Sequence, residues 1–193
     1  MICKEVLLAY KEEYNTSMIY IALLRGINAG NQRRVEMKKL KSLFESLGYI
    51  NVCTYINSGN VFFESDEKQN NIRENIETNI RKEFGLRIPT LIKTQKQIKK
   101  IADSIPNEWQ NNSDQKSDVA YLFPEIDSKK TLLELPIKKE FIDIHYVDGA
   151  IFWNIDRKNY NKSHINKIIS HELYQFMTIR NVNTARYLAK DYK

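Results

Sequence analysis

The chain has 193 residues, a formal net charge of +6, 42% hydrophobic and 28% charged residues, a composition typical of a globular protein long enough for one domain or two small ones. No apolar run reaches the roughly 18 to 20 residues that a membrane-spanning helix needs, which excludes a membrane protein. The two cysteines provide neither a disulfide framework nor a four-ligand zinc site, which favours a reducing, cytoplasmic location.

Residues 1–17 are expected to be an N-terminal extension ahead of the folded part. One basic residue precedes the apolar run from Val6 to Tyr10, and no small-residue cleavage site follows it, so a signal peptide is a poor match. We therefore expect a short added helix here and place the start of the fold at Met18.

The order of the elements in residues 18–106 predicts a ferredoxin-like subdomain followed by a linking helix. Apolar β-branched runs predict strands, and apolar residues at intervals of three and four predict amphipathic helices. The expected elements are a strand at 19–24, a helix at 35–47, strands at 51–56 and 60–64, a helix at 72–84, a strand at 88–92 and the linking helix at 98–105. The order β-α-β-β-α-β is the ferredoxin-like split pattern.

Residues 107–193 repeat this order and are predicted to form a second ferredoxin-like subdomain. The polar stretch 107–117 marks the boundary, Asp127 is a candidate N-cap, and Asp148-Gly149 predicts a hairpin. The expected elements are a strand at 119–123, a helix at 129–135, strands at 141–147 and 150–155, a helix at 163–173, a strand at 176–179 and a helix at 184–190. The predicted fold class is α+β, with two subdomains made of duplicated β-α-β-β-α-β units.

Three polar loops at the ends of predicted strands are candidate functional segments, because a rigid sheet presents function at such loops. The loops are residues 25–31, 57–60 and 180–184, and they contain amides and hydroxyls that are costly to bury unpaired. Turns and helix caps account for many of these residues, but they account least well for Arg25 and Arg180. The glycine spacing fits neither a Walker loop nor the dinucleotide fingerprint.

The same loops carry a resemblance to a known family. The stretches Tyr20 to Gly30, Met37 to Leu40, Thr54 to Val61, Lys162-Ser163 and Thr178 to Thr184 resemble the family called domain of unknown function 1697. The similarity runs from about Met18 to the C-terminus. It implies a two-subdomain α+β fold built on ferredoxin-like units, and it implies no established biochemical activity.

The leading hypothesis is that the protein binds an anionic small molecule, including a phosphate-bearing one, in a cleft between the two subdomains. Arginine supplies paired donors for a planar oxyanion, and amides and a hydroxyl fix its orientation. The predicted ligand-binding residues are Arg25, Gly26, Asn28, Ser58, Gly59, Asn60, Arg180, Asn181, Asn183 and Thr184. No pair of side chains forms a nucleophile and a base, and the histidines lack metal-ligand spacing, so catalytic residues and a cofactor stay unknown and no metal site is assigned.

Two other classes of function stay open. Single-stranded nucleic acid could stack on Tyr20 and Phe62 and contact basic segments of the surface. Those segments are residues 18–43, 81–100 and 156–193. Tyr20 shares a strand face with Ala22 and Leu24, however, which suggests that this face is buried, against the second subdomain. A purely structural or oligomerising module is the third hypothesis.

Overall fold

The structure is a computed structural model that describes residues 17–29 and 34–192. The extension predicted at residues 1–17 lies outside these ranges, apart from Ser17, whose hydroxyl donates to a Glu64 carboxylate oxygen at 3.4 Å. None of the helices in the described ranges is long and apolar enough to cross a bilayer.

The first half of the chain forms one antiparallel sheet, sheet A, and two helices. Its strands are β1 (Met18–Leu24), β2 (Ile50–Tyr55), β3 (Asn60–Ser65) and β4 (Thr90–Thr94), and its helices are α2 (Met37–Ser46) and α3 (Gln69–Phe84). The strand order across sheet A is β2-β3-β1-β4. The sequence predicted all six elements, with ends that differ by at most three residues from those observed.

The second half forms a second antiparallel sheet, sheet B, after the linking helix α4 (Gln95–Asp103). Its strands are β5 (Gln115–Leu122), β6 (Asp143–Val147), β7 (Ala150–Asp156) and β8 (Met177–Asn181). Its helices are α5 (Lys129–Glu134) and α6 (Val182–Leu188), and its short 3₁₀ segments are η1 (Pro124–Ile126), η2 (Lys139–Phe141), η3 (Arg157–Asn159), η4 (Ile165–Ser170) and η5 (Glu172–Phe176). The strand order is β6-β7-β5-β8, so the architecture is α+β with two four-stranded antiparallel sheets.

Two local predictions in the second half were wrong. The single helix expected at 163–173 is the pair η4 and η5, because His164 adopts a left-handed conformation with φ of 59° and His171 is extended between the two segments. Asp127 ends η1 rather than capping α5, and its carboxylate instead accepts the backbone N–H of Gly149 at 2.8 Å. The predicted hairpin around Gly149 is confirmed.

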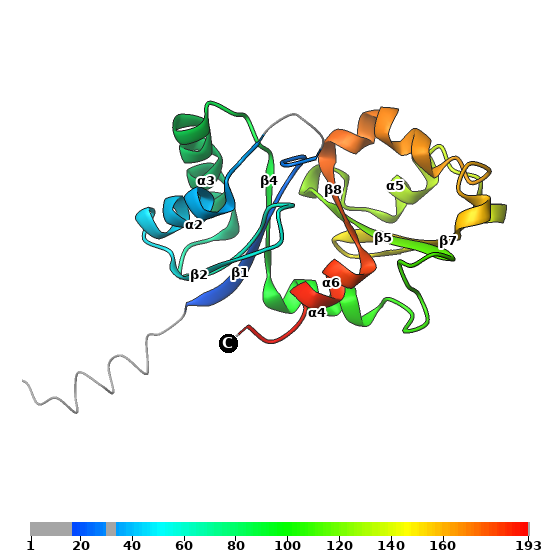
Figure 1. The fold of residues 1–193 in the computed structure, drawn as a ribbon, viewed down its shortest axis with the longest axis horizontal. Coiled ribbons are helices and arrows are strands. Elements are labelled where there is room, and N and C mark those ends of the chain that lie inside the picture. Colours follow the sequence, from blue (N-terminus) through cyan, green and yellow to red (C-terminus); the bar gives the residue numbers. More distant parts are fainter. Residues whose placement is uncertain (1–16, 30–33, 193) are drawn as a thin grey trace, which may run out of the picture.

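The two sheets share a central apolar cluster. It takes Ile21 and Leu23 from β1, Val119 and Tyr121 from β5, and apolar residues from α4 and α6. Helices α4 and α6 pack against each other and lie together below the two sheets in Figure 1. Helices α2 and α3 cover the other face of sheet A, and α5 with the 3₁₀ segments covers the other face of sheet B.

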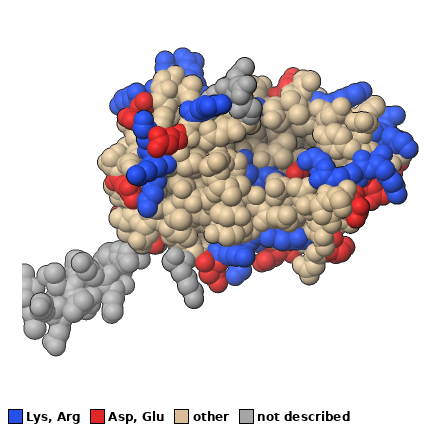
Figure 2. Space-filling view, viewed as in Figure 1, with Lys and Arg blue, Asp and Glu red and all other residues tan. Residues whose placement is uncertain are grey.

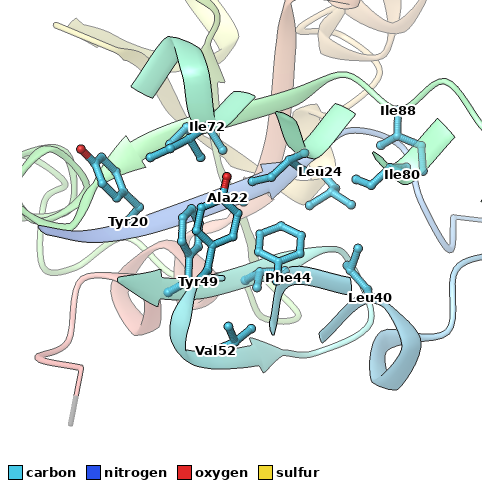
Figure 3. Packing of buried hydrophobic residues seen from close by; sticks show 14 of the residues in the cluster. Tyr20, Ala22, Leu24, Leu40, Phe44, Tyr49, Val52, Ile72, Ile80 and Ile88 are labelled. Atoms are coloured by element: carbon cyan, nitrogen blue, oxygen red, sulfur yellow. The ribbon is translucent and has the colours of Figure 1, made fainter. Parts of the chain in front are cut away.

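Tyr20 lies on the helix-covered face of sheet A. Figure 3 shows Tyr20, Ala22 and Leu24 among the side chains that pack together with Phe44 of α2. The expectation that this face is buried is confirmed, but the expectation that the second subdomain covers it was wrong. Because side chains alternate along a strand, it is Ile21 that faces sheet B.

Replacement of Gly59 by alanine tests the turn between β2 and β3. Gly59 has φ of 76°, and a Cβ there would lie 2.7 to 2.9 Å from side-chain atoms of Leu24 and Ile27. We expect Gly59→Ala to lower the free energy of unfolding by about 2 to 4 kcal/mol, since left-handed strain and overpacking add. Gly85→Ala is the matched control, because Gly85 has φ of 66° and open space around it. Equal losses in urea denaturation would contradict the steric account.

Candidate functional site

Arg180 of β8 joins sheet B to sheet A through an interior hydrogen-bond network. The side chain is only 7% exposed. Nε donates to Asn60 Oδ1 (2.7 Å), Nη1 donates to the Thr178 hydroxyl and the Ile179 carbonyl (both 2.9 Å), and Nη2 donates to the carbonyls of Leu24 (3.0 Å) and Ser58 (2.8 Å). A guanidinium has five N–H donors, so every donor of Arg180 is used inside the protein.

The predicted polar segment 57–60 provides two of these five acceptors, the Asn60 amide oxygen and the Ser58 carbonyl. Asn60 is fully buried, and its amide Nδ2 donates to the Tyr55 carbonyl and to the Ser58 hydroxyl, both at 3.0 Å. The Gly59 carbonyl accepts the backbone N–H of Leu24 at 2.8 Å. The turn is thereby fixed to β1, and its carbonyl groups are directed at Arg180.

Arg25 crosses between the halves in the opposite direction. It follows β1 directly, and its Nε donates to the carbonyls of Tyr174 (3.3 Å) and Met177 (3.1 Å) at the start of β8. Its guanidinium carbon also lies 4.8 Å from the centre of the Tyr174 ring, a cation–π contact. We call the contact of residues 24–25 and 58–60 with residues 174–180 the seam.

The charge of Arg180 is buried among neutral acceptors. All of its hydrogen bonds go to carbonyls, an amide and a hydroxyl, and burial lowers the pKa of Arg180 to about 10. Burial raises the pKa of the neighbouring Tyr121 hydroxyl, an effect that Arg180 opposes. Arg180 is therefore still a cation at neutral pH, and its charge gives the seam a positive electrostatic potential.

The other predicted site residues of the first half shape the loop after β1. Asn28 has φ of 54°, and its side-chain amide donates to the carbonyls of Val35 (2.9 Å) and Asn57 (2.8 Å) while it accepts the Val35 N–H. Gly26 is exposed and has φ of 66°. Asn28 thus closes the loop, and Gly26 supplies a backbone conformation that other residues adopt at a cost.

The remaining predicted residues lie at the start of α6. Asn181 caps this helix, because its Oδ1 accepts the backbone N–H of Thr184 at 2.8 Å. Thr184 is buried, whereas Asn183 is exposed. The alternative that turns and caps explain such residues therefore holds for Asn181, while Arg25, Asn60 and Arg180 connect the two halves.

The hydrogen-bond network around Arg180 holds a positive charge, but it contains no catalytic pair of a nucleophile and a base. Its members are guanidinium, amide, hydroxyl and carbonyl groups, and none of them is placed as a nucleophile beside a base. Among residues 17–29 and 34–192, no group of three His, Cys, Asp or Glu side chains could hold a metal ion.

Both aromatic side chains proposed to stack nucleic-acid bases are buried. Tyr20 is 3% exposed and Phe62 is 4% exposed. The Phe62 ring is already stacked on Tyr192, with 5.0 Å between the ring centres. Base stacking on either ring would therefore require the local packing to open.

Sequence reasoning missed one further buried cation between the halves. Lys93 of β4 is 7% exposed and lines a small cavity between the first and second halves. A signal was present, because Lys93 directly follows the apolar pair Leu91 and Ile92 within a short strand. Charged side chains are rarely buried without a partner.

Removal of the Arg180 side-chain charge tests whether this residue holds the halves together. Arg180→Met leaves several buried carbonyls and the Asn60 amide oxygen without donors, so we expect unfolding to become easier by about 3 to 5 kcal/mol. Arg186→Met is the matched control. Arg186 also donates to backbone carbonyls, those of Pro106 and Trp109 (2.8 Å each), but it is only partly buried, so water can replace it. The account fails if calorimetry gives both variants the same melting temperature.

The chain is similar to proteins for which no activity is stated. The family model described as "Protein of unknown function (DUF1697)" matches residues 18–153. The solved structure of the conserved bacterial protein SP0830 from Streptococcus pneumoniae matches with a TM-score of 0.77 and 25% identity, over 90% of this chain and 97% of that one. No curated protein matches the sequence. Because the family model covers well over half of the residues, the chain belongs to the DUF1697 family of proteins of unknown function.

Proposed function

We propose that the protein binds a small anionic molecule, including a phosphate-bearing one, at the seam between its two halves. The observation that carries this proposal is the buried Arg180 cation, whose hydrogen bonds all go to neutral groups. A buried positive charge without a carboxylate partner creates a positive potential around it. An anion at the seam would compensate that charge.

The predicted residues take different roles in this proposal. The rigid frame of the site and its positive potential come from Arg180, Asn60, Ser58 and Gly59. The donors and acceptors of these residues are used within the protein. Arg25 is partly exposed at the rim and supplies the direct contact. Gly26 and Asn28 shape the loop that follows it, and Asn181, Asn183 and Thr184 lie at the neighbouring start of α6.

Single-stranded nucleic acid is the alternative partner, and the geometry supports it less. Its proposed stacking platforms, Tyr20 and Phe62, are buried. On the face drawn in Figure 2, Lys and Arg side chains are interspersed with Asp and Glu instead of forming one basic stripe. A backbone-tracking groove needs such a stripe.

We also infer that each half is a ferredoxin-like unit, with residues 18–106 and 107–193 as the two subdomains. Support comes from the strand orders β2-β3-β1-β4 and β6-β7-β5-β8, which place corresponding strands at corresponding positions. In the second half, 3₁₀ segments stand where the first half has the long helix α3. The two-cysteine composition supports a cytoplasmic location.

Ligand-induced stabilisation tests the anion proposal. Phosphate, pyrophosphate and citrate are titrated at constant ionic strength, and the melting temperature is measured for the wild type and for Arg25→Ala. Binding to the native state alone stabilises it by about 2.7 kcal/mol at a hundredfold excess over the dissociation constant. We expect an anion-specific stabilisation of the wild type that Arg25→Ala loses.

Arg186→Ala is the matched control for this experiment, because it removes an arginine that bonds to carbonyls away from the seam. It should lower the basal stability and keep the anion-induced shift. A shift that survives in Arg25→Ala, or one that sodium chloride reproduces, would overturn the proposal. Salt-sensitive binding of mixed-sequence oligonucleotides in place of small anions would favour the alternative.

A further inference from the structure

The cavity beside Lys93 lies between the two halves. Residues of α3, β4 and α4 form one side of it, and residues at the end of β5 and in η1 form the other. Its volume is about 150 Å³, and Leu91, Ile92, Leu122 and Pro124 contribute apolar wall. The rest of the lining is polar, namely Gln69, Asn70, Arg73, Lys93, Gln97 and Asp127. Of its two cations, Arg73 is paired with Glu77 at 3.3 Å and with Glu125 at 3.5 Å, which leaves Lys93 as the one to examine.

Lys93 is a buried residue, 7% exposed, that lines this cavity with its ammonium-bearing side chain. The amine lies directly over the hairpin turn between β6 and β7, since a Cβ at Gly149 would be 2.5 Å from Nζ. No hydrogen bond or ion pair joins Nζ to any other residue in the described part of the chain. Lys100, by contrast, is paired at the surface with Asp148 at 3.0 Å.

One carboxylate lines the same cavity but keeps its distance from the amine. Asp127 Oδ1 accepts the backbone N–H of Gly149 at 2.8 Å and the hydroxyl of Tyr146 at 3.1 Å. These two bonds hold Asp127 farther from Lys93 than the 4.0 Å of an ion pair. Burial lowers the pKa of Lys93, and the charge of Asp127 opposes that shift. The positive charge of Lys93 is thus only partly compensated by Asp127.

We propose that this cavity is a binding site for a small monocarboxylate, with Lys93 as its counter-ion. A lysine ammonium is a compact point charge that suits one carboxylate group. We take propionate and glycine as probes, because the cavity is small. The apolar residues of the lining receive the carbon stem. Asp127 disfavours dianions, because Arg73, the other cation of the lining, is already paired with Glu77 and Glu125.

Simple carboxylic acids and small amino acids share this chemistry. An amino acid would add an ammonium group, which Asp127 in the same lining would receive. The site uses none of the residues assigned to anion binding at the seam, so it can fail or hold independently of that function.

Two-dimensional NMR of the amide-labelled full chain tests the proposal. Sodium propionate, glycine and alanine are titrated into the millimolar range at constant ionic strength, with sodium chloride as the control salt. We expect saturating shifts of the Gly149 and Asp127 amide signals with the carboxylates and none with chloride. Malonate, a dianion, should bind at least tenfold more weakly than propionate. Stronger binding of alanine than of propionate would identify the amino-acid source.

Lys93→Met is the test variant, because methionine keeps the apolar length of the side chain and lacks the charge. It should retain the dispersed spectrum of the folded protein and weaken propionate binding at least tenfold. Lys100→Met is the matched control, since Lys100 is a nearby exposed lysine outside the cavity lining. Its propionate affinity should stay within about twofold of the wild type.

Asp127→Asn provides a second variant with the opposite expected effect. It removes the negative charge of the cavity, so malonate should bind more tightly than it does to the wild type. The proposal is overturned if no carboxylate gives saturating shifts at Gly149, or if Lys93→Met folds and binds propionate as well as the wild type does. Loss of anion stabilisation in Arg25→Ala, measured separately, concerns only the seam.

Discussion

The organisation of the molecule depends on one buried guanidinium group that has to satisfy all of its donors. Arg180 sits on a strand of sheet B, but its Nη2 and Nε donate to Leu24, Ser58 and Asn60 of sheet A. A charge of this kind is expensive to bury, so it is retained only where its hydrogen bonds are made. This requirement fixes how the end of β1, the turn before β3 and β8 are placed relative to one another.

The apolar contacts around this network make the two halves mutually dependent. Sheet A turns Ile21 and Leu23 toward sheet B, and α6, which comes from the end of the chain, contributes to the same cluster. The C-terminal part also covers sheet A directly, because Tyr187 stacks on Tyr55 with 3.5 Å between ring centres. Burial of these faces leaves neither Tyr20 nor Phe62 open to stack a base of single-stranded nucleic acid.

The cations between the halves differ in how completely the protein satisfies them. Arg180 is fully hydrogen-bonded, and Arg25 binds carbonyls of the other half from a partly exposed position. Lys93 is as buried as Arg180 but has no hydrogen bond within the described ranges. A fully satisfied group rigidifies a structure, whereas an unsatisfied buried charge indicates a place where a ligand could gain affinity.

The sequence by itself determined most elements of the fold and singled out Arg25, Ser58, Gly59, Asn60 and Arg180 among the residues of the seam. Periodicity of apolar residues located the strands and helices of sheet A, and the two arginines stood out because turns and caps do not need a charge. The two 3₁₀ segments η4 and η5 replace the helix expected at 163–173, because the left-handed backbone at His164 and the extended backbone at His171 override the apolar spacing.

Only the tertiary structure decided which way each side chain points. Alternation along β1 sends Tyr20 to the helices, and the donors of Arg180 turn inward because the other half supplies their acceptors. The burial of Lys93 likewise arises from a hairpin turn that is distant in the chain, at Gly149. Such long-range partners leave no periodic signal in the sequence, since each half carries only one side of the contact.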